Sequence, residues 1–175
     1  MKAYIIKIDL LDSYPLIWRR VIMPADATFR RLHDVIQTVT NFLSGGPYGG
    51  YHLYEFDLST ENTSVTNDEE SFEEYQYYKQ NKKQYEERLR LAPLGSFERS
   101  DLERLMKTVV RQPSRIKIDN YLEKYKEIRY SYDFGDGWEF LITLEQIVDD
   151  YHFGYPTLLD GAESAPPEDV GGLGG

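Results

Sequence analysis

Hydrophobic and polar residues alternate along the start of the chain. Residues 3–11 carry apolar side chains at every second position, which is typical of a strand with one buried face. A turn follows at residues 12–15, and residues 17–23 alternate again until Pro24 ends the pattern. Because the connection is short, the two segments predict an antiparallel hairpin.

The pattern then changes to a helical period. Thr28 is a suitable N-cap residue, because its hydroxyl can accept a hydrogen bond from a backbone amide of the first turn. Apolar side chains recur after it at the spacing of a buried helix face, at Phe29, Leu32, Ile36 and Val39. Asn41 and the glycine-rich residues 44–50 predict the end of this helix. Residues 51–58 alternate and predict a third strand.

The pattern of residues 59–112 is helical for most of its length. Residues 61–74 are acidic and polar and predict a loop at first. From Ser71 the pattern becomes helical, and residues 92–95 break it with a proline and a glycine. Residues 100–103 (SDLE) have the spacing of a capping box, so we expect a second helix to begin there.

The clearest hairpin pattern lies in the last third of the chain. Residues 127–134 and residues 138–144 both alternate, and residues 135–137 (GDG) lie between them. Glycine adopts the positive φ angles that tight hairpin turns need, so these residues predict the turn. After Glu145 the chain is rich in Gly, Pro, Asp and Glu, and we expect irregular structure to the end.

These segments predict an α+β fold in a single domain over residues 1–175. We expect a mostly antiparallel sheet of about five strands, by count of the alternating segments, with the helix after Thr28 packed on one face. Residues 59–112 are expected to form a helical insertion that projects from one edge. A chain of 175 residues is long enough to bury one core of normal size.

Acidic residues are unevenly distributed along the chain. The formal net charge is −10, yet residues 1–132 contain 20 acidic and 20 basic residues. The ten acidic residues between Asp133 and Asp169 therefore account for the whole net charge, and no Lys or Arg follows Tyr130.

Composition also excludes several classes of protein. The chain has no cysteine, which excludes disulfides, thiolate metal sites and cysteine nucleophiles and predicts a cytoplasmic location. No apolar run approaches the roughly 18 residues of a membrane span, so no membrane partner is expected. A pI near 4.8 argues against bulk binding of nucleic acid, which draws on a clustered basic face.

The acidic residues of the last third are the sharpest candidates for a site. Carboxylate oxygens are the ligands that Mg²⁺, Mn²⁺ and Ca²⁺ prefer, and a histidine adds a nitrogen ligand. The candidate metal ligands are Asp133, Asp136, Glu168 and Asp169, joined by His52. Two metal ions bridged by such carboxylates would imply phosphoester hydrolysis.

A structural use of the same carboxylates is the competing interpretation, and we favour it. Asp and Gly build turns, because Asp side chains bind their own backbone there. Arg19 and Arg20 are also expected to pair with these carboxylates, since a guanidinium matches a carboxylate in a bidentate fork. No phosphate-binding loop, zinc-ligand spacing or Ser-His-Asp order is present in the sequence.

Aromatic and histidine side chains give a second set of candidates. Trp18, Trp138 and the pair Tyr130 and Tyr132 would form either a ligand-stacking wall or part of the core, and their place on alternating strands favours the core. His33 lies beside the apolar stripe of the first helix and is expected to be packed and hydrogen-bonded.

A third candidate is a basic, aromatic segment in the helical insertion. Its members are Lys79, Lys82, Lys83, Arg88 and Arg90, with Tyr75, Tyr77, Tyr78 and Tyr85. Such a segment would contact nucleic acid, but the interspersed Glu86 and Glu87 favour an ordinary solvated helix face.

Five motifs in a fixed order give the chain a family resemblance. They are residues 15–21 (PLIWRRV), 32–37 (LHDVIQ), 52–56 (HLYEF), 132–138 (YDFGDGW) and 166–172 (PPEDVGG). Together they resemble the plasmid pRiA4b ORF-3-like family, an uncharacterised family found on plasmids, insertion elements and chromosomes. Some members carry a resolvase-type label from an insertion element. The resemblance implies a single roll-like α+β domain.

The chain departs from this family at several positions. Many relatives carry cysteines where this chain has Leu158, Ala165 and Val170, so a thiolate metal site is not general to the fold. Relatives often have a histidine two residues after the motif tryptophan, where this chain has Phe140. The connector at residues 59–112 is longer than usual. Relatives also continue beyond the position of the last residue here, so we expect a tail to be missing.

No complete catalytic set can be assembled from these residues. We therefore expect a non-catalytic binding or interaction module for a protein or small ligand, associated with mobile elements. The first alternative is a divalent-metal-dependent phosphoester hydrolase that uses the acidic cluster and His52. The second alternative is nucleic-acid binding through the insertion.

Overall fold

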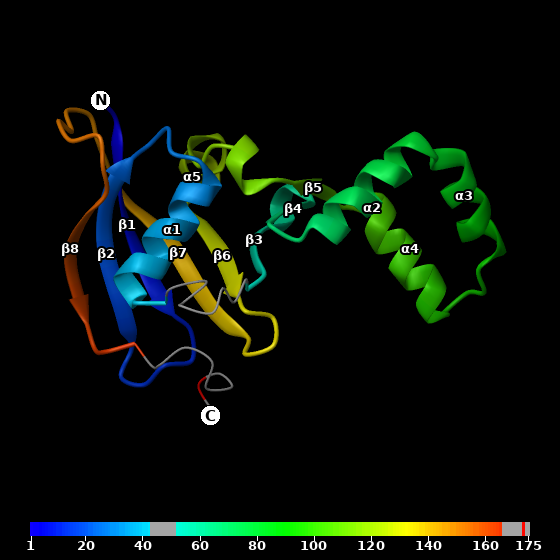
Figure 1. The fold of residues 1–175 in the computed structure, drawn as a ribbon, viewed down its shortest axis with the longest axis horizontal. Helices are drawn as coiled ribbons and strands as arrows, with labels where there is room; N and C mark the ends of the chain where they lie inside the picture. Colours follow the sequence, from blue (N-terminus) through cyan, green and yellow to red (C-terminus); the bar gives the residue numbers. More distant parts are fainter. Residues whose placement is uncertain (43–51, 166–172, 174–175) are drawn as a thin grey trace.

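A single eight-stranded sheet organises the chain (Figure 1). A computed structural model describes residues 1–42, 52–165 and 173. The strands are β1 (Ala3–Leu10), β2 (Ile17–Pro24), β3 (Tyr54–Leu58), β4 (Thr63–Thr66), β5 (Val109–Arg111), β6 (Glu127–Tyr132), β7 (Trp138–Val148) and β8 (Thr157–Ala162). Their order is β5-β4-β3-β6-β7-β1-β2-β8, and only β4 and β5 pair in parallel.

The α+β class is thus confirmed, but the expected number of about five strands is wrong for the described residues. β4 and β5 have only 4 and 3 residues, which is too short for a period of two to be recognised. β8 was expected to be irregular. Five of its six residues are exposed, so it has no alternation of buried and exposed positions to predict it.

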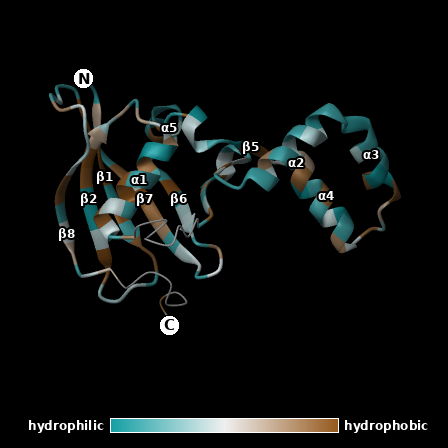
Figure 2. Cartoon of the chain, in the orientation of Figure 1, coloured by the Kyte–Doolittle hydropathy of each residue, from teal (hydrophilic) through white to brown (hydrophobic). Residues whose placement is uncertain are grey.

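The main core lies between the sheet and two helices on the same face (Figure 1). The helices of the described residues are α1 (Phe29–Thr40), α2 (Glu69–Gln80), α3 (Lys82–Leu91), α4 (Phe97–Lys107) and α5 (Asp119–Tyr125), with short 3-10 helices η1 (Ser59–Glu61) and η2 (Pro113–Arg115). α1 contributes Phe29, Leu32 and Ile36 to the core, and α5 contributes Tyr121 and Leu122. The middle strands are rich in hydrophobic residues (Figure 2).

The local signals at the ends of α1 are those that the sequence predicts. The Thr28 hydroxyl oxygen accepts a hydrogen bond from the Arg31 amide at 3.1 Å. Asn41 ends the helix in the left-handed region with a φ of 60°. Asn tolerates this conformation better than most residues, so it is a suitable C-terminal cap.

Residues 59–112 contain a helical arm that projects from the sheet edge (right in Figure 1). The structure has three helices here where the pattern predicts two, because the helix is interrupted at Asn81, between α2 and α3. Ser96 caps α4 through its hydroxyl and the Arg99 amide at 3.2 Å, so the predicted start at Ser100 lies inside the helix. The arm has its own small core around Tyr85, Ala92 and Leu102.

β6 and β7 form the predicted hairpin, with Tyr132 opposite Trp138. β7 continues to Val148, beyond the expected end near residue 144. Phe134 continues the alternation of residues 127–134 but is 50% exposed, because it lies in the turn after β6 has ended. No helix of the described residues is long and apolar enough to cross a membrane.

Candidate functional site

The turn between β6 and β7 is organised by the side chain of Asp133. Its Oδ1 atom accepts hydrogen bonds from the amides of Gly135 at 3.2 Å and Asp136 at 3.3 Å. Its backbone has a φ of 55°, and its carbonyl accepts a bond from the Gly137 amide at 2.6 Å. A short polar side chain that binds its own turn is the structural use expected for this aspartate.

His52 and Asp133 lie together, as their grouping in the sequence suggests. The Nδ1 atom of His52 is 3.3 Å from Oδ2 of Asp133. The Asp133 amide donates to the Leu53 carbonyl at 2.9 Å, which ties the turn to the residues just before β3. The His52 ring also meets the edge of Tyr132 at 5.6 Å between centroids. One oxygen of Asp133 therefore holds the turn while the other faces a histidine.

Two buried polar atoms near this turn have no hydrogen-bond partner among the described residues. They are Oδ2 of Asp136 and Nε1 of Trp138. Trp138 is only 1% exposed and packs against Phe42 with 5.2 Å between ring centroids. An unpaired buried polar atom costs about 1–3 kcal/mol and often marks a place where water or a ligand binds.

The predicted metal ligands do not form a complete set in the part of the chain that the structure describes. No group of three or more His, Asp or Glu side chains there is arranged to hold an ion. Glu168 and Asp169 lie outside the described residues. His52, Asp133 and Asp136 would supply oxygen and nitrogen to Mg²⁺, Mn²⁺ or Ca²⁺, but one oxygen of Asp133 is used by the turn.

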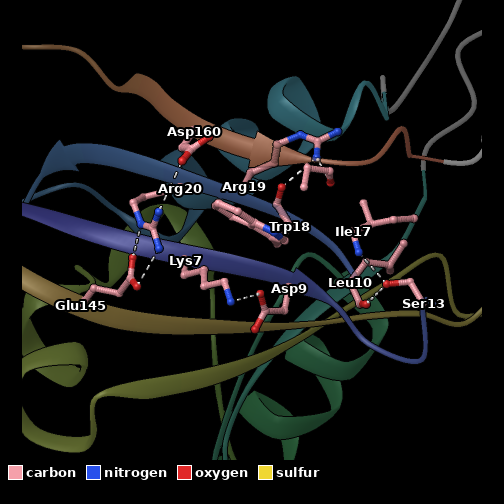
Figure 3. A network of polar contacts seen from close by, with 11 residues as sticks. Lys7, Asp9, Leu10, Ser13, Ile17, Trp18, Arg19, Arg20, Glu145 and Asp160 are labelled. Atoms are coloured by element: carbon pink, nitrogen blue, oxygen red, sulfur yellow. Dashed lines mark hydrogen bonds and ion pairs between the residues drawn. The ribbon is translucent and has the colours of Figure 1, made fainter. Parts of the chain in front are cut away.

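Arg20 pairs with carboxylates, but not with those of the turn (Figure 3). Its Nε and Nη2 atoms bind the two oxygens of Glu145 at 2.6 and 3.1 Å, and Nη1 lies 3.7 Å from Asp160. The hydrogen bond to Arg20 lowers the pKa of Glu145. The predicted pairing with Asp133 and Asp136 is wrong for Arg20. Arg20 lies opposite Lys7 of β1, which in turn lies opposite Thr143 in the middle of β7, away from the turn.

Arg19 points to the other face of the sheet and bonds to backbone carbonyls. Its Nε atom donates to Val39 at 3.0 Å, and its Nη1 atom donates to Trp18 at 2.8 Å and to Ala162 at 3.1 Å. Arg19 thus joins the C-terminal end of α1 to β2 and β8. The expectation that it pairs with Asp133 or Asp136 is also wrong, since its donors are directed at these carbonyls.

The close approach of β8 to Arg19 requires a glycine. A Cβ atom at Gly161 would lie 2.8 Å from Cδ of Arg19 and 3.0 Å from the Trp18 carbonyl oxygen. Both contacts are shorter than ordinary van der Waals distances, so any side chain at this position would push β8 away from β2. The free space at Gly161 is therefore what lets the Arg19 side chain reach Val39.

The aromatic candidates separate onto two faces of the sheet. Trp138, Tyr130 and Tyr132 lie in the main core, as favoured by the sequence. Trp18 lies on the opposite face instead, where Lys7 and Arg20 are 5.3 and 4.9 Å from its ring centroid. Alternation along β2 explains the difference, because Trp18 and Arg20 share the face that does not contact α1.

His33 is a packed histidine, as predicted. Its Nδ1 atom lies 2.7 Å from the Tyr130 hydroxyl oxygen, and its ring stacks on Tyr54 with 3.7 Å between centroids. Burial, and secondarily the charge of Arg30, lowers the pKa of His33 to about 3. The residue is therefore neutral near pH 7 and has no free access to solvent.

Sequence reasoning missed a groove between α1 and the segment that leads into β8. The groove has a volume of about 490 Å³. It is lined by Val21 of β2, by residues of α1 and by the entry to β8: Arg31, Asp34, Val35, Thr38, Val39, Tyr155, Pro156, Thr157 and Leu158. No sequence signal joins these elements, because they lie more than a hundred residues apart and β8 itself was not predicted.

The basic residues of the helical arm are partly engaged in contacts within α3. Arg90 pairs with Glu87, and Arg88 lies 5.1 Å from the centroid of the Tyr85 ring. Helix α3 is largely hydrophilic on its surface (Figure 2). These contacts agree with the solvated helix face that the interspersed acidic residues favour.

The chain is similar to known proteins, among them the following two. One is the uncharacterized protein y4hQ of Sinorhizobium fredii, 26% identical over 167 residues. The match covers 95% of this chain, which spans 66% of the length of that relative. The other is a crystal structure of MM3350, a protein of unknown function from Methanosarcina mazei Go1. It is 27% identical with a TM-score of 0.64, and the match covers 98% of this chain and 75% of that one.

The resemblance carried by the five ordered motifs extends over nearly the whole chain. Residues 2–175 match the family described as plasmid pRiA4b ORF-3-like protein. The match includes residues 59–112, which contain the helical arm. The chain therefore belongs to the plasmid pRiA4b ORF-3-like family.

Proposed function

We propose that this chain is a non-catalytic binding module and that its ligand lies in the groove between α1 and β8. The observation that carries the proposal is the groove itself, whose volume of about 490 Å³ lies within the range of roughly 300–1,000 Å³ of ligand pockets. The plasmid in the family description supports an association with mobile elements. The absence of cysteine supports a cytoplasmic location.

The chemistry of the groove favours binding over catalysis. Val21, Val35 and Val39 give it an apolar floor, and Leu158 forms part of the opposite wall. The described lining contains no histidine, lysine or cysteine, and its one carboxylate, Asp34, lies 3.5 Å from the Arg30 guanidinium. An apolar side chain of a protein partner, or a small apolar ligand with a few polar groups, suits such a site.

A substitution that fills the groove tests this proposal. Thr38 is exposed and lines the groove, so Thr38→Trp places a large ring inside it without disturbing the core. We expect saturable binding of a neutral apolar dye such as Nile red to the wild-type protein, and at least a tenfold weaker affinity in the variant. Arg30→Trp is the matched control, because Arg30 is exposed on the same helix but does not line the groove.

The binding assignment fails if the two tryptophan variants bind the dye equally well. It also fails if the wild-type protein shows no saturable binding. Circular dichroism and urea unfolding of both variants check that the fold is retained, so that a loss of dye binding reports on the groove alone.

A second candidate function is divalent-metal-dependent hydrolysis of phosphoesters. The contact of His52 with Asp133 at 3.3 Å and the unpaired buried oxygen of Asp136 support it. In this proposal Glu168 and Asp169 complete the ligand set. The residues would bind Mg²⁺, Mn²⁺ or Ca²⁺, and the ions would supply a Lewis acid for the phosphoryl oxygen.

Metal titration separates the two functions. If an ion binds the folded protein, the melting temperature rises with metal concentration, and Asp136→Asn combined with Glu168→Gln abolishes the rise. Glu98→Gln combined with Glu103→Gln makes the same change of charge on the arm and is expected to leave the rise intact. If the melting temperature of the wild-type protein does not change with metal concentration, the hydrolase proposal is eliminated.

A further inference from the structure

β8 forms one outer edge of the sheet. It is the last strand in the order of the sheet, and among the described residues it pairs only with β2. Five of its six residues are exposed and none is fully buried, so neither face of the strand is covered completely. An edge strand presents unpaired backbone amide and carbonyl groups, which form a template for one more strand.

The exposed residues at this edge are apolar to an unusual degree. Leu158 is 53% exposed and Leu159 is 48% exposed, although they are neighbours in the strand. A shift in register between β2 and β8 leaves Leu159 without a partner in the ladder. Just before the strand, Phe153 and Tyr155 are 55% and 56% exposed, and their rings are in contact at 5.6 Å. Large apolar side chains gathered at one exposed edge mark an interaction surface.

Two hollows adjoin along β8. The first is the groove beside α1, and the second has a volume of about 550 Å³ and is lined by Arg19 and by residues 158–164. Leu158 belongs to both. Together they form a trough from Tyr155 to Ser164, and an extended strand of this length has room for alternate side chains in it.

The charge of this region favours a basic occupant. Residues 149–165 contain four acidic residues and no Lys or Arg. Of the arginines beside them, Arg31 lines the groove from α1, Arg19 donates to backbone carbonyls and Arg20 binds Glu145. The side chain of Asp160 is 62% exposed, and Glu163 lies at the end of the trough. Antiparallel pairing of two β8 strands from separate copies would bring these carboxylates close to one another, and facing like charges destabilise a sheet. A second copy of the chain is therefore disfavoured as the occupant.

We propose that an extended segment of a protein partner, with alternating apolar and basic residues, adds to β8 as a ninth strand. Its backbone pairs with the free edge of β8, its apolar side chains enter the trough and its basic side chains meet Asp160 and Glu163. This recognition mode takes affinity from main-chain hydrogen bonds and specificity from pockets for alternate side chains. The inference rests on the proposed binding function and names the class of partner.

A labelled peptide tests the strand pairing directly. The probe is a fluorescein-labelled decapeptide that alternates valine and lysine, and its affinity is measured by fluorescence anisotropy at about 0.15 M salt, where weak long-range attraction is screened. Alternate amides of a strand point to the same edge. Methylation of the amide nitrogens of either the valines or the lysines therefore blocks one edge of the peptide. We expect one methylated peptide to lose at least tenfold in affinity and the other to retain it.

Variants of the protein test the charge and the location. Asp160→Asn keeps the side-chain oxygen that accepts the Gly161 amide at 2.8 Å but removes the charge, so we expect several-fold weaker binding. Glu98→Gln on the arm is the matched control with the same change of net charge, and we expect unchanged binding. Thr38→Trp is expected to weaken binding of the peptide as well as binding of the dye.

The possible outcomes are distinct. Equal effects of the two methylated peptides overturn strand addition, and equal effects of Asp160→Asn and Glu98→Gln overturn the role of β8 in the attraction. If the dye binds in the groove but the peptide does not bind, the strand proposal falls and the binding module stands. If neither binds, both fall. If sedimentation shows dimers and Leu158→Lys dissociates them, the edge pairs with a second copy of the chain. That result would also overturn the proposal that a partner peptide adds to β8.

Discussion

His33 lies on the buried face of α1, with Nδ1 at 2.7 Å from the Tyr130 hydroxyl oxygen and its ring stacked on Tyr54. Gln37 donates to the same hydroxyl at 3.2 Å, so one tyrosine oxygen serves two side chains of the helix. This cluster joins α1 to β3 and β6 by polar contacts inside an apolar core. Such contacts stabilise the fold only while the histidine remains neutral, because a buried charge without a partner is costly.

The stability of the protein is therefore expected to depend on the protonation of His33. The pKa of His33 in the fold is about 3, below the usual 6.5. The neutral His33 contributes to the free energy of unfolding above pH 6.5. This contribution is lost as the pH falls from 6.5 toward 3, at about 1.4 kcal/mol per pH unit. Urea unfolding between pH 4 and 7 should show a shallower slope in His33→Gln than in the wild type.

The control for this measurement is His152→Gln, which removes an exposed histidine. It is expected to leave the slope close to that of the wild-type protein, so the comparison isolates burial. A slope that is the same in His33→Gln and in the wild type would contradict the assignment of a buried, neutral histidine.

At the level of elements, Arg19 and Gly161 determine how α1, β2 and β8 meet. Gly161→Ala places a methyl group 2.8 Å from Cδ of Arg19, and we expect a loss of about 1–3 kcal/mol in the free energy of unfolding, as for other overpacked sites. Shortening the arginine should relieve this strain. The cost of Gly161→Ala is therefore expected to be smaller in an Arg19→Ala background, as measured in a double-mutant cycle.

Independent, additive effects of these two substitutions would contradict the contact. Gly154→Ala, in the segment that leads into β8, serves as the control. A Cβ atom there would meet nothing within 4 Å, so little change in stability is expected.

Several elements could be predicted from the sequence because their signals are local. The cap at Thr28, the stop at Asn41 and the hairpin of β6 and β7 all arise from residues adjacent to the elements that they define. The start of α4 was misplaced at Ser100, because Ser96 offers a hydroxyl in the same way and lies nearer to the break in the chain. Both serines offer the same local signal, and the one that directly follows residues 92–95 starts the helix.

At the scale of the whole molecule, the helical arm and the sheet have separate cores. No residue of the arm cluster around Tyr85, Ala92 and Leu102 belongs to the main core. β4 and β5, which lead into and out of the arm, are neighbours in the sheet. The arm is thus expected to be removable without loss of the main core.

A deletion tests this separation. Replacing residues 69–107 by a flexible linker of about eight Gly and Ser residues spans the neighbouring strands without strain. We expect the free energy of unfolding of the sheet to change by less than about 1 kcal/mol, and dye binding in the groove to be unchanged. Unfolding of the shortened protein in urea would be followed by circular dichroism. An unfolded or aggregated product would contradict the independence of the two cores.

The sequence by itself determined the α+β class, the family and the main amphipathic helix, because these follow from local periods and ordered motifs. The partners of Arg19 and Arg20, the strand β8 and the groove beside α1 were decided only by the tertiary structure. Each of these joins residues that are distant in the chain, and which carboxylate or carbonyl a guanidinium meets depends on strand order and register. The strand β8 could not be predicted, because its residues do not alternate between buried and exposed positions and so leave no period of two in the sequence.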